Sequence, residues 1–132
     1  MNLEEYLFNR LGEEAAEVVQ GATKILSFGS EHRVPSNRMA ANDYLVAEIN
    51  DILGVADFLK ECGIELFGIG KPQAREAKIQ KIITYMQVSI DAGRLTLSDE
   101  ELTMINNRND GKPLHHRIGD TVAATFEQKE SA

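Results

Sequence analysis

Two pairs of acidic residues have a spacing that suits cation binding. Glu14 and Glu17 stand three residues apart in "LGEEAAEVVQ", and Glu48 and Asp51 stand three residues apart in "EIND". On a helix, residues at this spacing lie on neighbouring parts of one face, so each pair would present two carboxylates together. Carboxylates without Cys or His form an all-oxygen ligand set, which suits Mg²⁺ or Mn²⁺ and argues against zinc.

The first glutamate of each pair falls within an apolar stripe. At about 100° per residue, Glu14 lies inside the stripe that contains Leu7, and Glu48 lies between Val55 and Leu59. Burying a carboxylate in an apolar seam costs several kcal/mol unless a counter-charge compensates it. If the two helices pack antiparallel, the four carboxylates would converge, and their convergence would require a cation.

Apolar periodicity predicts an all-α fold, a helical bundle of three long helices plus a short C-terminal helix. Pro72 suits the first turn of the third helix, and Ser98 with Glu101 forms a capping box before the fourth. Helices of about 20 residues leave an apolar face wider than three of them can cover, so oligomerisation to a homodimer or homotetramer is expected to complete the bundle. The predicted helices cover residues 2–27, 38–62, 72–92 and 99–108.

The segment between the first two helices predicts a loop over residues 28–37. It collects Gly, Ser, Pro and Asn, which favour turns, and Ser36 or Asn37 could cap the second helix. A loop of about ten residues is longer than the usual ~4 to 6 and is often functional.

Composition limits the classes of function. With 132 residues, the chain can build one modest core, and its net charge of -7 with no dense basic run makes nucleic-acid binding improbable. Cys62 is the single cysteine and reads as a small buried hydrophobic residue. No apolar run approaches a membrane span and the first residues are acidic, so we expect a cytoplasmic protein without a signal peptide.

The motifs "EEAAE" and "EIND" resemble the paired Glu-x-x-Glu and Glu-x-x-Asp signature of the MazG-like all-α nucleoside triphosphate pyrophosphatases. That superfamily includes the dimeric dUTPases and dCTP pyrophosphatases. The resemblance covers about residues 10–95. It implies a catalytic helical domain over residues 1–95. The capping box before the fourth helix and the lack of a sustained apolar period after it predict a short helix and a loosely ordered C-terminal tail over residues 96–132.

The resemblance also implies an activity and a site. The chain would be a Mg²⁺-dependent pyrophosphohydrolase, with Mn²⁺ as an alternative ion, that converts a (d)NTP to a (d)NMP and pyrophosphate and so controls or cleanses the nucleotide pool. Glu17 and Glu48 would be the catalytic residues. The metal ligands would be Glu14, Glu17, Glu48 and Asp51.

Cationic side chains are expected to contact the substrate phosphates. Lys71, Arg75 and Lys78 fall along one edge of the apolar stripe of the third helix, and Lys24 lies on the same flank of the first helix as Glu17. Arg75 and Lys78 are the first candidates, because an extended cation beside an apolar seam is well matched to phosphate oxygens.

Two departures from the family pattern matter. Thirty residues separate Glu17 from Glu48, slightly more than is usual, and only about ten residues precede the first acidic motif, where the family commonly has a complete helix. A partner subunit or the segment after residue 98 would then complete the bundle.

Two other functions remain open at this point. A non-catalytic helical interaction protein would use the acidic residues only as a charged flank, which is what most such runs are. Another metal-dependent hydrolase would use the same cluster on a different phosphoanhydride. The sequence leaves open the base and sugar preference, the number of metal ions and the choice between dimer and tetramer.

Overall fold

The computed structural model describes residues 1–33 and 38–119. Within these residues the chain forms four α-helices and no β-sheet, which confirms the predicted all-α fold of three long helices and a short fourth one. Contacts divide the chain into two compact units, Met1–Ile69 and Gly70–Ala132. The helices are α1 (Leu3–Phe28), α2 (Ala41–Glu61), α3 (Pro72–Asp91) and α4 (Asp99–Arg108).

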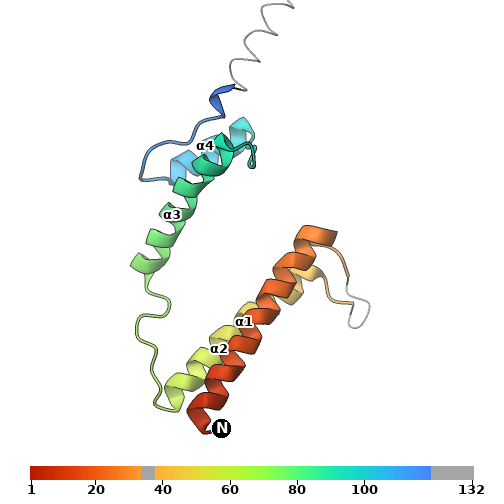
Figure 1. The fold of residues 1–132 in the computed structure, drawn as a ribbon, viewed down its shortest axis with the longest axis vertical. Helices are drawn as coiled ribbons and strands as arrows, with labels where there is room; N and C mark the ends of the chain where they lie inside the picture. Colours follow the sequence, from red (N-terminus) through yellow and green to blue (C-terminus); the bar gives the residue numbers. More distant parts are fainter. Residues whose placement is uncertain (34–37, 120–132) are drawn as a thin grey trace, which may run out of the picture. The chain divides into compact units, whose positions relative to one another are not determined.

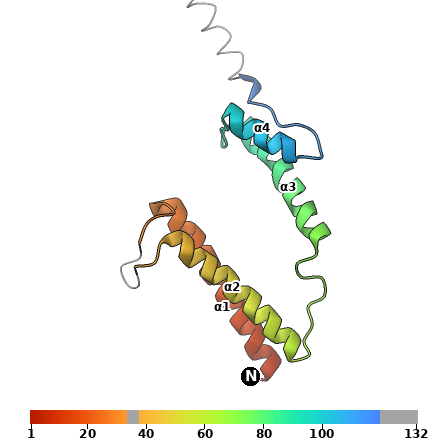
Figure 2. The same cartoon turned by 180° about the vertical axis from the view of Figure 1, so that it is seen from behind.

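The first unit is an antiparallel hairpin of α1 and α2 (Figures 1 and 2). Its core forms along the facing apolar stripes, where Leu7, Ala41 and Leu59 are buried. Leu59 is completely inaccessible to solvent, with an exposed fraction of 0%. The antiparallel arrangement on which the convergence of the two acidic motifs depends is therefore present.

The ends of the hairpin helices are set by local hydrogen bonds. Asn2 and Glu5 form a capping box at the start of α1, which satisfies two amide groups that the helix leaves without partners. Helix α2 begins at Ala41 rather than at residue 38, because its first amides donate to loop carbonyls: Ala41 N to His32 O at 2.8 Å and Asn42 N to Ser30 O at 3.0 Å. The predicted caps at residues 36 and 37 lie outside the described residues.

The second unit contains α3 and α4. Pro72 occupies the first turn of α3, and Ser98 with Glu101 forms the predicted capping box of α4, with Glu101 N donating to Ser98 Oγ at 3.1 Å. The two helices are joined by an ion pair in which both arms of the Arg108 guanidinium contact the Glu76 carboxylate, the Nη1–Oε1 bond being 2.7 Å long.

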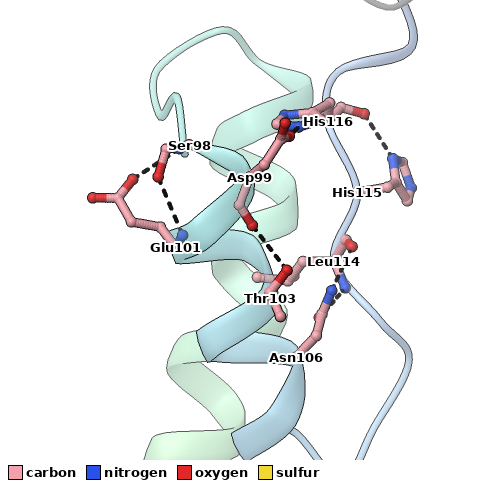
Figure 3. A network of polar contacts seen from close by, with 8 residues as sticks. All are labelled: Ser98, Asp99, Glu101, Thr103, Asn106, Leu114, His115 and His116. Atoms are coloured by element: carbon pink, nitrogen blue, oxygen red, sulfur yellow. Dashed lines mark hydrogen bonds and ion pairs between the residues drawn. The ribbon is translucent and has the colours of Figure 1, made fainter.

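The segment that follows α4 is hydrogen-bonded to α4, as Figure 3 shows, and also to Gln87 of α3. The Asn106 side chain donates to Leu114 O at 2.9 Å and accepts from Leu114 N at 2.7 Å, while His115 N donates to the Gln87 side chain at 2.9 Å. His116 Nε2 lies 2.6 Å from Asp99 Oδ1, at the start of α4. These bonds hold Leu114 in a buried position; residues 120–132 lie outside the described part of the predicted tail.

The ion pair between Glu76 and Arg108 predicts an acid-sensitive contribution to stability. The Arg108 guanidinium, with help from Gln80, lowers the pKa of Glu76 from 4.5 to about 2. A depressed carboxyl pKa stabilises the fold fully above the unfolded value and loses that effect as the pH falls from about 4.5 to about 2. We therefore expect Glu76→Gln to lower the thermal midpoint at pH 7 by a small amount, because the pair is exposed, and to lower it progressively less in that acid range.

Circular dichroism melts of wild type and Glu76→Gln at several pH values test this expectation. Glu100→Gln, which neutralises an exposed carboxylate of the same unit, is the control. A difference between wild type and Glu76→Gln that stays constant from pH 7 into the acid range would contradict it.

Among the described residues, no helix is both long and apolar enough to cross a lipid bilayer.

Candidate metal centre

Three of the four predicted ligands converge between the helices of the first unit. Glu14 and Glu17 extend from α1 and Glu48 extends from α2, and one carboxylate oxygen of each lies within 4.8 Å of the others. The hairpin produces this convergence because the two Glu-bearing turns lie at the same level of the antiparallel pair. Three carboxylates at this separation repel one another strongly unless protons or a cation neutralise them.

The two glutamates predicted to lie within apolar stripes are indeed buried. Glu14 retains 7% and Glu48 retains 6% of its accessible surface, whereas Glu17 is exposed. The cluster is therefore closed on the side of the hairpin core and reachable from solvent on the side of Glu17.

Glu48 is the member of the cluster whose carboxylate most clearly lacks a compensating partner. Its Oε2 atom is buried and has no hydrogen-bond partner within the part of the chain that the structure describes. A hydrogen bond with the Glu17 carboxyl and burial raise the pKa of Glu48 above 4.5. Buried polar atoms are normally paired, so an orphaned carboxylate oxygen inside an acidic cluster indicates a site that needs positive charge.

Asp51, the fourth predicted ligand, is not part of the cluster formed by the three glutamates. It is exposed on α2, yet its negative charge is close enough to contribute to the raised pKa of Glu48. Asp51 therefore adds to the negative potential of the site, and its role as a direct ligand stays a prediction.

Arg10 is the internal counter-charge of the cluster, and the sequence analysis did not identify it. Its Nη2 atom donates to Glu14 Oε1 at 2.8 Å, and its Nη1 atom donates to Glu13 Oε2 at 2.5 Å. The available signal was the spacing, because Arg10 stands one helical turn before Glu14, where side chains of a helix meet. In the absence of another cation, Arg10 supplies the only positive charge recorded in contact with the three glutamates within the described residues.

Arg10 is expected to compete with a divalent ion for Glu14. Arg10→Gln removes a positive charge next to the site and with it the Coulomb repulsion between Arg10 and the ion. Mn²⁺ should therefore bind roughly threefold to tenfold more tightly. Isothermal titration calorimetry at low ionic strength measures this change. Lys60→Gln, which removes a positive charge about three turns of α2 away from Glu48, is the control and should leave the affinity nearly unchanged. Weaker binding by Arg10→Gln would instead show that Arg10 holds Glu14 in its binding orientation.

The predicted phosphate contacts fall into two groups. Lys24 belongs to the first unit and is half-buried, with its ammonium group 4.9 Å from the centre of the Tyr44 ring. Lys71, Arg75 and Lys78 belong to the second unit, at the start of α3, where all three are exposed. Their roles in phosphate binding stay predictions.

The geometry defines a helical hairpin with a partly buried, all-carboxylate centre whose donor set fits a hard divalent cation. No protein-family model, curated protein or solved structure matches the chain.

Proposed function

We propose that this chain is a Mg²⁺-dependent nucleotide pyrophosphohydrolase of the MazG-like type, which converts a (d)NTP to a (d)NMP and pyrophosphate and so controls or cleanses a nucleotide pool. The observation that carries the proposal is the convergence of Glu14, Glu17 and Glu48 around the unpartnered Oε2 atom of Glu48. If the acidic residues were only a solvent-exposed helix face, all of their carboxylates would be expected to remain exposed, whereas two of them are buried.

The same observation argues against a purely structural cluster. Burying carboxylates without compensation destabilises a fold, and residues that do so are commonly found where a ligand supplies the missing charge. A divalent cation supplies it here with oxygen ligands alone, and Mn²⁺ is a reasonable substitute for Mg²⁺ on this donor set.

The chemistry of the reaction assigns roles to the residues. A water oxygen forms a bond to the α-phosphorus, the bond between that phosphorus and the bridging oxygen breaks, and pyrophosphate leaves with the electron pair. We assign Glu17, the exposed member of the cluster, to orient the water and accept its proton. Glu14 and Glu48, fixed by burial, would hold the ion, which when bound neutralises phosphate charge and polarises phosphoryl oxygens.

Cations of the chain would bind the remaining phosphate charge. Lys24 is the candidate within the first unit because it stands on the same helix as Glu14 and Glu17, with its ammonium group over the ring of Tyr44. Arg75 and Lys78, followed by Lys71, are the candidates from α3. A nucleoside triphosphate brings about four negative charges, so these side chains would act together with the ion.

We also propose that the protein acts as a homo-oligomer, a homodimer or a homotetramer. Each helix of the hairpin exposes apolar residues along a second stripe, and such stripes are usually covered by another subunit. Size-exclusion chromatography with light scattering tests this proposal. The stripes are Phe8, Val19 and Leu26 on α1 and Val46, Ile49 and Leu53 on α2.

The direct test is product analysis with a panel of canonical and modified (d)NTPs, in Mg²⁺ and in EDTA. We expect pyrophosphate and the matching monophosphate only when Mg²⁺ is present. Pyrophosphate identifies cleavage between the α and β phosphates, and the relative rates across the panel would identify the preferred base and sugar.

The other outcomes favour the competing functions. Metal-dependent release of orthophosphate would indicate a hydrolase that acts on another phosphoanhydride bond. No hydrolysis by folded protein, together with no stabilisation by Mg²⁺ and nucleotide in a thermal melt, would favour a non-catalytic acidic helical interaction protein.

A further inference from the structure

The second unit carries an apolar groove between its two helices. The groove has a volume of about 410 Å³ and lies along the middle of α3 and the C-terminal half of α4. Its walls are apolar side chains at helical spacing, and its one charged wall residue, Arg108, is already paired with Glu76. The lining residues are Ile79, Ile82, Ile83 and Met86 of α3 and Met104, Ile105 and Arg108 of α4.

Several side chains of the groove are accessible to solvent. Ile82 retains 48% and Met104 retains 64% of its accessible surface, and Ile79 is also exposed. The walls offer almost no hydrogen-bonding groups, so a nucleotide or another polar ligand would lose its contacts with water on entering the groove without gaining new ones. An apolar surface that extends over two turns of a helix is instead the kind of surface on which another helix packs.

The end of the groove beside the start of α3 is basic. Arg75 stands one turn before Ile79 and lies in line with the apolar residues of the groove, and Lys71 and Lys78 lie on the flank. All three cations are exposed. Five cations and two anions give this end a net charge of +3. These residues are Lys71, Arg75, Lys78, Arg108 and Lys112, with Glu76 and Asp110.

The opposite end of the groove, at the start of α4, is acidic. Helix α4 begins with Asp99, Glu100 and Glu101, all of them exposed, and Glu101 stands one turn before Met104 in line with the groove. Four anions and two cations give this end a net charge of -2, with His116 counted as neutral. These residues are Asp91, Asp99, Glu100 and Glu101, with Arg94 and Arg117, whose guanidinium lies beside Gly93.

We propose that this groove binds the same groove of a second copy of the chain, with the two α3–α4 pairs antiparallel. A two-fold axis through the middle of the groove places the basic end of each copy against the acidic end of the other. The surface is therefore complementary to itself, as an interface between identical subunits related by a two-fold axis requires. The exposed apolar side chains of the two copies cover one another, and the four helices form a bundle.

The size of the surface suits this partner. Helices of 20 and 10 residues are about 30 Å and 15 Å long and about 10 Å wide, so the face has an outline of roughly 450 Å². Two such faces together approach the value of about 1,000 Å² expected for a small specific interface.

The groove belongs to the second unit, whereas the exposed apolar stripes of α1 and α2 belong to the first. The chain would thus have two surfaces for self-association, and two kinds of interface are what a closed tetramer built from dimers requires. This inference goes beyond the proposed activity and depends on neither the metal nor the substrate.

Ile82→Glu in the full chain tests the proposal, because it places a charge in the groove at a half-exposed position. We expect the mass measured by size-exclusion chromatography with light scattering to fall to half of the wild-type value. Val88→Glu is the matched control, because Val88 is 59% exposed on the same helix and lies about 180° around α3 from Ile79. It should keep the wild-type mass, and circular dichroism reports the helix content of each variant.

Two further measurements support the comparison. Met104→Glu disrupts the groove from α4 and should halve the mass as well, even if Ile82→Glu lowers the helix content. Cross-linking gives a positive signal: in a Cys62→Ser background, Ile82→Cys should yield a covalent dimer with a short bismaleimide, whereas Val88→Cys should not. Because opposite charges meet at both ends, about 1 M NaCl should shift wild type toward the smaller species.

The results that would overturn the inference are specific. Folded Ile82→Glu and Met104→Glu that keep the wild-type mass would show that the groove is not an interface between copies. A loss of helix content in both variants at an unchanged mass would show that another part of the same chain covers the groove. Wild type that is monomeric at every concentration would overturn this inference together with the proposed homo-oligomer. None of these results would decide the proposed hydrolysis, which is measured separately as pyrophosphate release.

Discussion

Replacing Glu48 with glutamine is expected to lower Mg²⁺-dependent pyrophosphate release by about 10³-fold, because loss of a metal ligand removes about 4 kcal/mol of transition-state stabilisation. Glutamine keeps the shape of the side chain but cannot carry the negative charge. The helix content should be retained, since the substitution relieves the repulsion of a buried carboxylate that has an unpartnered oxygen. Initial rates at saturating Mg²⁺, with circular dichroism spectra, test both parts.

Glu61→Gln provides the matched control, because it makes the same change at an exposed position near the end of α2. It should leave the rate within about twofold of wild type. Retention of most of the activity by Glu48→Gln would mean that the acidic cluster is not the catalytic centre, even if the protein hydrolyses nucleotides. Glu17→Gln should also abolish activity if Glu17 orients the water.

The largest expected effect on stability is at Leu59. Its side chain has an exposed fraction of 0%, the lowest in the hydrophobic core of the described residues. Leu59→Ala should lower the free energy of unfolding by about 2–5 kcal/mol, through lost burial and the cavity left between α1 and α2. Urea denaturation followed by circular dichroism measures this change.

Leu26→Ala is the control for Leu59→Ala, because Leu26 is 88% exposed on α1. The same substitution there should change the free energy of unfolding by no more than about 0.5 kcal/mol. Equal effects at the two positions would show that Leu59 does not form part of the hairpin core.

The helical architecture was predictable because it depends on local pattern. Apolar periodicity and the capping box at Ser98 predicted four helices, and α4 begins and ends at the predicted residues 99 and 108. The start of α2 was not predictable in the same way. Its first amides are satisfied by carbonyls of residues 30 and 32, which no side-chain cap in the sequence would reveal.

The acidic centre was predictable only in part. The apolar stripes predicted the burial of Glu14 and Glu48, since a residue within a stripe follows its helix into the core. Arg10 was missed as a neighbour of the cluster because a single arginine on a helix has many roles, and only packing selects one. The phosphate contacts proposed on α3 belong to the second unit, and helical periodicity carries no information about the approach of separate units.

The short chain separation within the α1–α2 hairpin has a consequence for how the protein is made. All the groups assigned to the centre in the first unit lie between residues 10 and 48, so their contacts form over a short stretch of sequence. Folds dominated by such low contact order form rapidly, and N-terminal units fold first during synthesis. The carboxylates would therefore be brought together on the ribosome, before α3 and α4 emerge. The three carboxylates would then repel one another from that early stage of synthesis. A divalent cation that binds them under the proposed function could reduce this repulsion from then on.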